Sequence, residues 1–106
     1  MNKRTKALQI PREVKDKVER RDSWDGWPCC IFCGSTDARA EAHVIPRSQG
    51  GLGVEKNTIT VCRDCHKKLD HTGERQEKLK FAKEYLANMY EDWNEDDLVY
   101  RRELYE

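Results

Sequence analysis

The sequence predicts a small α+β domain in which four cysteines hold short strands and a helix together, with further helices at both ends. Two observations support this class. The chain has 106 residues, of which 38% are charged and 37% hydrophobic, so its apolar core must be small and a disulfide set or a structural metal should supplement it. Two Cys-x-x-Cys pairs also enclose a segment with both strand-like and helix-like stretches, which places the two kinds of secondary structure in one unit.

The N-terminal part combines a basic segment with a helix. Residues 1–9 are expected to form a frayed basic arm. Pro11 suits the first turn of a helix, and Val14 and Val18 would share one face of it.

A turn is predicted after this helix, where residues 23–28 spell SWDGWP. An Asp-Gly pair is typical of tight turns. Trp24 and Trp27 flank that pair, and we expect them to pack in the core rather than to stack on nucleic-acid bases.

Metal ligation is the best interpretation of the five cysteines. No stretch resembles a signal peptide or a membrane span, so we expect a cytoplasmic protein whose thiols stay reduced. An odd number of cysteines in such a compartment is poorly suited to disulfides. Two pairs share the same spacing and lie 28 residues apart, and their four thiolates can hold a tetrahedral Zn²⁺: Cys30 with Cys33, and Cys62 with Cys65.

Other interpretations of these cysteines fit less well. Cys29 could replace Cys30 as a ligand, but the matching two-residue spacing favours Cys30. Unliganded buried cysteines are one alternative. A thioredoxin-type redox pair is another, and neither Cys-x-x-Cys follows the βαβ pattern that it requires.

Between the two cysteine pairs the sequence predicts a strand, a glycine loop, a second strand and a helix. Residues 39–45 alternate in polarity, and Pro46 limits that strand. Glycines at positions 50, 51 and 53 mark the loop. Residues 58–62, TITVC, have the β-branched content of a strand. The helix begins at the second cysteine pair and should end near Gly73.

Helices are predicted to complete the chain. Residues 74–91 carry an apolar stripe typical of a helix that packs on a core, formed by Leu79, Ala82, Leu86 and Met89. Asn94 can cap a last short helix that holds Leu98 and Tyr100. The prediction is one compact domain in three parts: an N-terminal arm and helix at 1–27, the zinc-stapled core at 28–73, and C-terminal helices on that core at 74–106.

Polar side chains with catalytic potential lie inside the cysteine frame. His43 is on the first predicted strand, Asn57 precedes the second, and His66 directly follows the last cysteine. Asp70 comes four residues after His66, so on a helix the two would point the same way and could share one cation. These groups suit metal-assisted phosphodiester hydrolysis. The imidazole would accept a proton from water, the amide would orient the imidazole, and the cation would stabilise the negative charge that develops. Taken singly, each residue has a plainer interpretation: a packed or zinc-bound histidine, a turn residue, or a helix residue.

Charge is distributed unevenly although the formal net charge is zero. Residues 1–21 carry +5 (eight Lys/Arg against three Asp/Glu) and residues 88–106 carry −5 (two against seven). Either a polyanion binds toward the N-terminal half, or these are two solvated helix faces. Candidate phosphate contacts are Arg47, Arg63 and Lys67, whereas His71 is expected at the surface.

Three motifs agree in order and spacing over about residues 28–73: C-x2-C, AHVIPRSQGGLG and N-x4-C-x2-CH. This segment resembles the ββα-metal core of the HNH endonucleases, particularly the small zinc-bearing HNH proteins of bacteriophages and bacteria. The resemblance implies a DNA endonuclease that leaves 5′-phosphate and 3′-hydroxyl ends. It implies that His43 is the general base, that Asn57 supports its geometry, and that His66 binds a catalytic divalent metal together with Asp70.

One position departs from that family pattern. Many HNH enzymes place a metal-binding Asp or His immediately before the base, where this chain has Ala42. Glu41 is close, but regular strand alternation turns it to the face opposite Ala42 unless the backbone bulges. We therefore expect a metal held mainly by His66 and Asp70, with Mg²⁺ or Mn²⁺ favoured.

Partners follow from the resemblance rather than from single residues. DNA is the expected substrate, and the phage terminase large subunit is an implied partner because small phage HNH proteins often assist genome packaging. No membrane association is expected, and the chain should be a monomer or a weak dimer. Two alternatives are a non-catalytic zinc ribbon that binds nucleic acid or protein, which would not need His43, and a nuclease that depends on a partner for DNA affinity.

Overall fold

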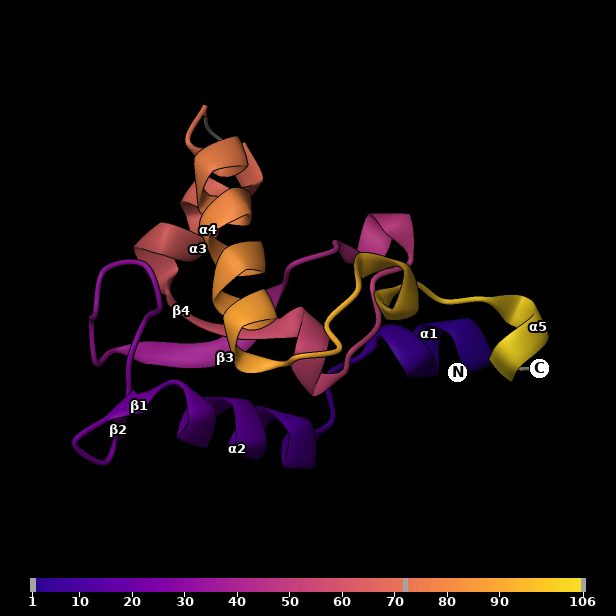
Figure 1. Ribbon diagram of the computed structural model, residues 1–106, viewed down its shortest axis with the longest axis horizontal. Helices are drawn as coiled ribbons and strands as arrows, with labels where there is room; N and C mark the ends of the chain where they lie inside the picture. The colour runs from indigo at the N-terminus through magenta and orange to yellow at the C-terminus, as the bar shows by residue number, and fades with distance from the viewer. Residues whose placement is uncertain (1, 72, 106) are drawn as a thin grey trace.

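A short antiparallel sheet lies between two layers of helices in the computed structural model, which describes residues 2–71 and 73–105. The sheet consists of β3 (Ala38–His43) and β4 (Thr58–Cys62). One face is covered by α2 (Arg12–Arg21), and the other by α3 (Arg63–His71) and α4 (Arg75–Met89), as Figure 1 shows. This arrangement confirms the predicted α+β class.

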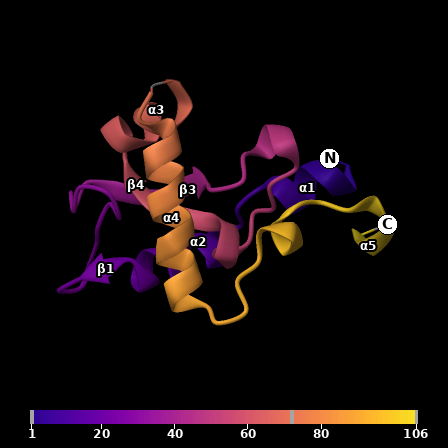
Figure 2. The same ribbon diagram turned by 45° about the horizontal axis from the view of Figure 1, so that its top comes forward.

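Shorter elements surround this centre. They are α1 (Lys3–Leu8), β1 (Ser23–Trp24), β2 (Trp27–Pro28), the 3-10 helices η1 (Arg47–Gln49), η2 (Glu55–Asn57) and η3 (Glu95–Leu98), and α5 (Arg102–Tyr105). The first and last helices, α1 and α5, lie at the same end of the molecule in both views (Figures 1 and 2). Within the described residues, no helix has the length and apolar character needed to cross a membrane.

The central hairpin forms as the sequence predicts. All five residues of β4 are buried, because helices cover both faces of its β-branched sequence TITVC. The helix after it ends at His71, close to the predicted break at Gly73. In α4, Ala82 and Leu86 are fully buried as predicted, but Met89 is 42% exposed. Met89 is the last residue of α4 and lies on the exposed side of a turn whose Leu86 is buried, so its assignment to the core was wrong.

The N-terminal segment is a helix rather than a frayed arm. The Asn2 side chain accepts a hydrogen bond from the Thr5 amide at 2.7 Å, which caps the first turn of α1. Leu8, at the end of this helix, is only 3% exposed. A capped first turn and one buried apolar side chain therefore order a segment whose composition suggests a flexible arm.

The two tryptophans do not pack in the core as predicted. Trp24 and Trp27 are 80% and 66% exposed and face each other across the β1–β2 hairpin. Asp25 and Gly26 both have positive φ values, 51° and 85°, which is the turn geometry that suits a two-residue hairpin. This tight turn closes the hairpin on itself and leaves the indoles outside the layers.

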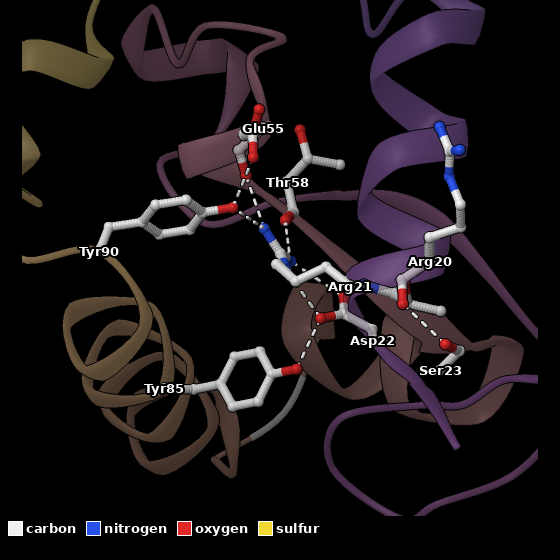
Figure 3. Close-up of polar contacts among 9 residues, drawn as sticks. Arg20, Arg21, Asp22, Ser23, Glu55, Thr58, Tyr85 and Tyr90 are labelled. Carbon is white, nitrogen blue, oxygen red and sulfur yellow. Dashed lines mark hydrogen bonds and ion pairs between the residues drawn. The ribbon is translucent and has the colours of Figure 1, made fainter. Parts of the chain in front are cut away.

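A buried carboxylate connects α2 to the sheet and to α4. Asp22 is 6% exposed, and its side chain accepts hydrogen bonds from Arg21, from the Tyr85 hydroxyl at 2.6 Å and from the Thr60 amide at 3.1 Å. Figure 3 shows the arginine and tyrosine contacts converging on this carboxylate. Burying a charge is costly without such partners, and here every partner belongs to a different element or to the end of α2.

Arg21 extends this network to the segment before β4. Its guanidinium donates to the backbone oxygens of Glu55 and Thr58, both at 2.8 Å, and to the Tyr90 hydroxyl at 3.3 Å (Figure 3). Burial lowers the pKa of the guanidinium, but Asp22 and Tyr90 raise it by more, so the group stays charged. The positive charge of Arg21 thus balances the buried carboxylate beside it.

We expect Asp22→Ala to lower the free energy of unfolding by about 3 kcal/mol, because it leaves the Arg21 charge unbalanced and the Thr60 amide unpaired. Urea unfolding followed by circular dichroism measures this change. Asp37→Ala removes an exposed carboxylate and should change stability by less than about 0.5 kcal/mol. Equal effects of the two substitutions would contradict the structural role of Asp22.

Candidate functional site

Four cysteines converge at the junction of β3, β4 and α3. The sulfurs of Cys30, Cys33, Cys62 and Cys65 lie within 4.8 Å of one another. Among the residues that the structure describes, this is the one cluster in which three or more His, Cys, Asp or Glu ligand atoms lie so close to one another. Four thiolates at this spacing suit a tetrahedral Zn²⁺, and Cys30, not Cys29, contributes the first of them.

Backbone hydrogen bonds favour the thiolate of Cys30, whereas burial and the neighbouring thiols raise the pKa of Cys65. Burial raises the pKa of the Cys30 thiol, but backbone hydrogen bonds from Cys62, Cys33 and Phe32 lower it to about 7. Gly34 adopts a φ of 80°, which lets the chain turn around the sulfur. The sulfur of Cys29 instead donates to the Trp27 carbonyl oxygen at 3.2 Å.

A cavity of about 520 Å³ opens beside β3 and collects most of the predicted site residues. His43, His66, Asp70 and Arg47 all line it. Arg63 and Lys67 are exposed on α3 but do not line this cavity, and Asn57 is fully buried and does not line it either. The side chain of His71 lies outside the described residues.

His43 is held in one tautomer by a backbone oxygen. Its Nε2 lies 2.7 Å from the Leu8 carbonyl oxygen, which can only accept, so Nε2 carries the proton and Nδ1 has the free lone pair. Burial lowers the pKa of the imidazole below its ordinary 6.5, the Leu8 hydrogen bond raises it, and the charges of Arg47 and His66 lower it again. The result is a neutral ring at pH 7 whose Nδ1 can accept a proton.

Sequence reasoning missed this carbonyl, because a backbone oxygen leaves no residue-type signature. Its position depends on the glycine loop, since the Gly53 amide donates to the Ala7 carbonyl oxygen at 3.0 Å. A Cβ at Gly53 would overlap the Gln9 carbonyl oxygen. Only glycine therefore allows the chain after α1 to approach the loop and bring Leu8 to the histidine.

Asn57 fixes the loop that follows His43. Its Oδ1 accepts from the Ile45 amide at 2.8 Å, and its Nδ2 donates to the Leu52 and Ile45 carbonyl oxygens at 2.8 and 3.2 Å. The side chain is fully buried. Asn57 has no recorded contact with the imidazole, so it positions the backbone around His43 and does not orient the ring directly.

Other charged groups come from three separate elements. Lys15 of α2, Arg47 of η1 and Arg75 of α4 line the cavity. Lys15 and Arg75 were not predicted, because they are distant from the motif in sequence. Cations around a histidine with a free lone pair suit a negatively charged ligand such as a phosphodiester.

A β-bulge shapes the wall of the cavity just before His43. Ala40 pairs with Thr60 and Ala42 with Ile59, so Glu41 is an extra residue in β3. The Ala40 amide, next to the bulge, donates to the Glu19 carboxylate at 3.0 Å. Ala42 is 2% exposed, whereas Glu41 is exposed and lines the cavity. In a regular strand the Glu41 side chain would point away from the face of Ala42, and only a bulge could bring it to the cavity. That bulge is present.

Comparisons with known proteins agree with this geometry. Residues 30–82 match the family model described as HNH endonuclease. The chain belongs to the HNH endonuclease family. It is also 33% identical over 64 residues to Anaredoxin from Nostoc sp. strain PCC 7120, a match that covers 59% of this chain and 78% of that protein. HNH membership indicates a nuclease or another nucleic-acid-related function together with a metal site, and the recognised match begins at the first clustered cysteine.

We expect removal of the metal to unfold the HNH core, because a domain with so small an apolar core depends on its structural metal. Cys62→Ser should abolish bound zinc and the cooperative unfolding transition, as measured by metal analysis and circular dichroism. Cys29→Ser provides the matched control and should retain one zinc per chain. A folded Cys62→Ser protein without zinc would contradict this dependence.

We also expect the His43 imidazole to titrate below 6.5, because burial disfavours its charged form. Histidine-detected ¹⁵N NMR at a series of pH values measures both the midpoint and the tautomer. The neutral form should carry its proton on Nε2. A midpoint at or above 6.5, or a proton on Nδ1, would contradict the orienting role of the Leu8 carbonyl.

Proposed function

We propose that this HNH protein is a metal-dependent DNA endonuclease with His43 as its general base. The main support is the hydrogen bond from Nε2 to the Leu8 carbonyl, which leaves Nδ1 of a neutral imidazole available at the cavity. A general base must be unprotonated at working pH and held at a fixed angle. Burial lowers the pKa of His43 and so favours the unprotonated ring, and the Leu8 contact holds the ring at a fixed angle. The HNH family favours DNA as the substrate.

In this proposal the chain's own residues manage the proton and the substrate. Nδ1 of His43 accepts a proton from water as the water oxygen bonds to phosphorus. The bond from phosphorus to the 3′ oxygen then breaks, and that oxygen takes a proton from solvent, which leaves 5′-phosphate and 3′-hydroxyl ends. Asn57 keeps the loop around the base in place through its bonds to Ile45 and Leu52.

A divalent metal completes the proposed site. His66 and Asp70 lie four residues apart on α3 and both line the cavity, and their nitrogen and oxygen donors suit Mg²⁺ or Mn²⁺. When bound, such an ion would stabilise negative charge on the phosphate and the leaving oxygen. The cavity cations Lys15, Arg47 and Arg75 would hold the flanking phosphates without reading bases.

The family resemblance adds the terminase large subunit as a partner in this proposal. A chain with no net charge gains little DNA affinity from electrostatics. A partner that delivers DNA would compensate for this. Co-purification of the two proteins, followed by cleavage assays with and without the partner, tests this part.

We expect the zinc-loaded protein to nick or linearise supercoiled plasmid with Mg²⁺ or Mn²⁺ and to be inactive in EDTA. His43→Ala should reduce the cleavage rate by about 100-fold or more, because the base is lost. Gel electrophoresis of plasmid over a time course measures both effects.

Each variant must retain zinc and its unfolding transition for this comparison. Glu84→Gln, on the exposed surface of α4, should cleave like the wild type. Unchanged cleavage by His43→Ala would assign the base elsewhere. A wild type that binds DNA but does not cleave it with either metal would favour the non-catalytic zinc-ribbon alternative.

A further inference from the structure

We propose that Glu41 is a third protein ligand of the divalent metal, and that the β-bulge in β3 carries its carboxylate to the site in place of a ligand at Ala42. This inference rests on the proposed function, because the metal belongs to the same site. It goes further by assigning a residue that neither the family pattern nor the strand periodicity selects.

The bulge is the first observation. Without an extra residue, successive side chains of β3 would point to opposite faces of the sheet. Here Glu41, Ala42 and His43 are consecutive, and all three line the same cavity. The pairing shift between Ala40 and Ala42 accounts for this, since a bulge turns the side chains of the bulged strand away from regular alternation.

The residue before the base supplies no ligand in this chain, because alanine has no donor atom on its side chain. Ala42 is 2% exposed and packs in the core with Ile59 and Val44. The nearest acidic side chain along β3 with access to solvent and to the cavity is that of Glu41.

The carboxylate of Glu41 also has no polar partner among the described residues. Glu41 lines the first cavity and also a neighbouring groove that contains Arg12, Lys15 and Arg39. Within the described part of the chain, no hydrogen bond or ion pair joins its carboxylate to any of these cations. A carboxylate that serves only to balance these cations would be expected to pair with one of them. An unpaired carboxylate at the cavity is free to bind a cation.

The donor set fits a hard divalent ion. His66 contributes a nitrogen, and Glu41 and Asp70 contribute oxygens, from the two elements that flank the cavity. The three donors are more widely spaced than the four sulfurs of the cysteine cluster. Binding must therefore order flexible side chains, which predicts moderate affinity and a shell completed by water and phosphate oxygens.

Mn²⁺ titration of the zinc-loaded protein tests this assignment, with free Mn²⁺ measured by its electron paramagnetic resonance signal. We expect Glu41→Gln to weaken Mn²⁺ binding by about tenfold or more, and His66→Ala to do the same. Glu84→Gln makes the identical chemical change away from the cavity and should leave the affinity unchanged.

A second substitution separates ligation from a general charge effect. Glu41→His loses the negative charge but keeps a donor atom, now a nitrogen. If Glu41 binds the metal, this variant should bind Ni²⁺ more tightly than Glu41→Gln does, because imidazole suits Ni²⁺. Circular dichroism and zinc content confirm that each variant is folded.

The assignment would be overturned by Mn²⁺ affinity that is unchanged in Glu41→Gln but lost in His66→Ala. Equal Ni²⁺ affinity of the Glu41→His and Glu41→Gln variants would also overturn it. A wild type that binds no Mn²⁺ in the titration would overturn it too. Plasmid cleavage is measured separately. If the wild type cleaves DNA and Glu41→Gln binds Mn²⁺ as tightly as the wild type, Glu41 is not a ligand and the proposed function still holds.

Discussion

The carboxylate of Asp22 is the constraint on which the packing of this domain depends. In a chain with so few apolar residues, the buried apolar surface is too small to fix the relative positions of the helices by itself. Asp22 fixes these positions through directional hydrogen bonds, because its two oxygens accept from the end of α2, from β4 and from α4 at the same time. Hydrogen bonds specify an angle and a register that apolar contacts leave open. The neighbouring Arg21 then anchors the segment that leads into Asn57.

The candidate site depends on segments outside the recognised HNH match as much as on those within it. The loop after His43 is held on one side by α1, where Gly53 meets Ala7, and on the other by the C-terminal segment, where Leu52 bonds to Leu98 and Gly50 to Tyr100. These flanking contacts surround the base, and one of them brings the Leu8 carbonyl to it. The flanks therefore act as parts of the site, and the family core alone lacks the group that sets the tautomer.

The sequence predicted features that depend on spacing along the chain. Two cysteine pairs, a glycine loop and a β-branched strand specify local geometry, so the cluster, the hairpin and the helix after it could be placed in advance. The Leu8 carbonyl, Lys15 and Arg75 could not, because tertiary packing brings them to the cavity from distant segments. The prediction that Trp24 and Trp27 pack in the core was wrong, because it gave more weight to their hydrophobicity than to the tight Asp25–Gly26 turn between them. Sequence indicated that a bulge at Glu41 would matter but could not reveal its presence.

The bulge also affects how this chain should be aligned with its relatives. An inserted residue in an edge strand is absorbed locally, so the residues on either side keep their places in the core. Counting backward from the histidine then equates Ala42 with ligand positions in other HNH proteins, although the exposed carboxylate is one residue further away. Substitution patterns at positions 41 and 42 should accordingly be compared as a pair. The bulge thus exposes the carboxylate of Glu41 to the cavity while Ala40 and Ala42, on either side of it, stay buried.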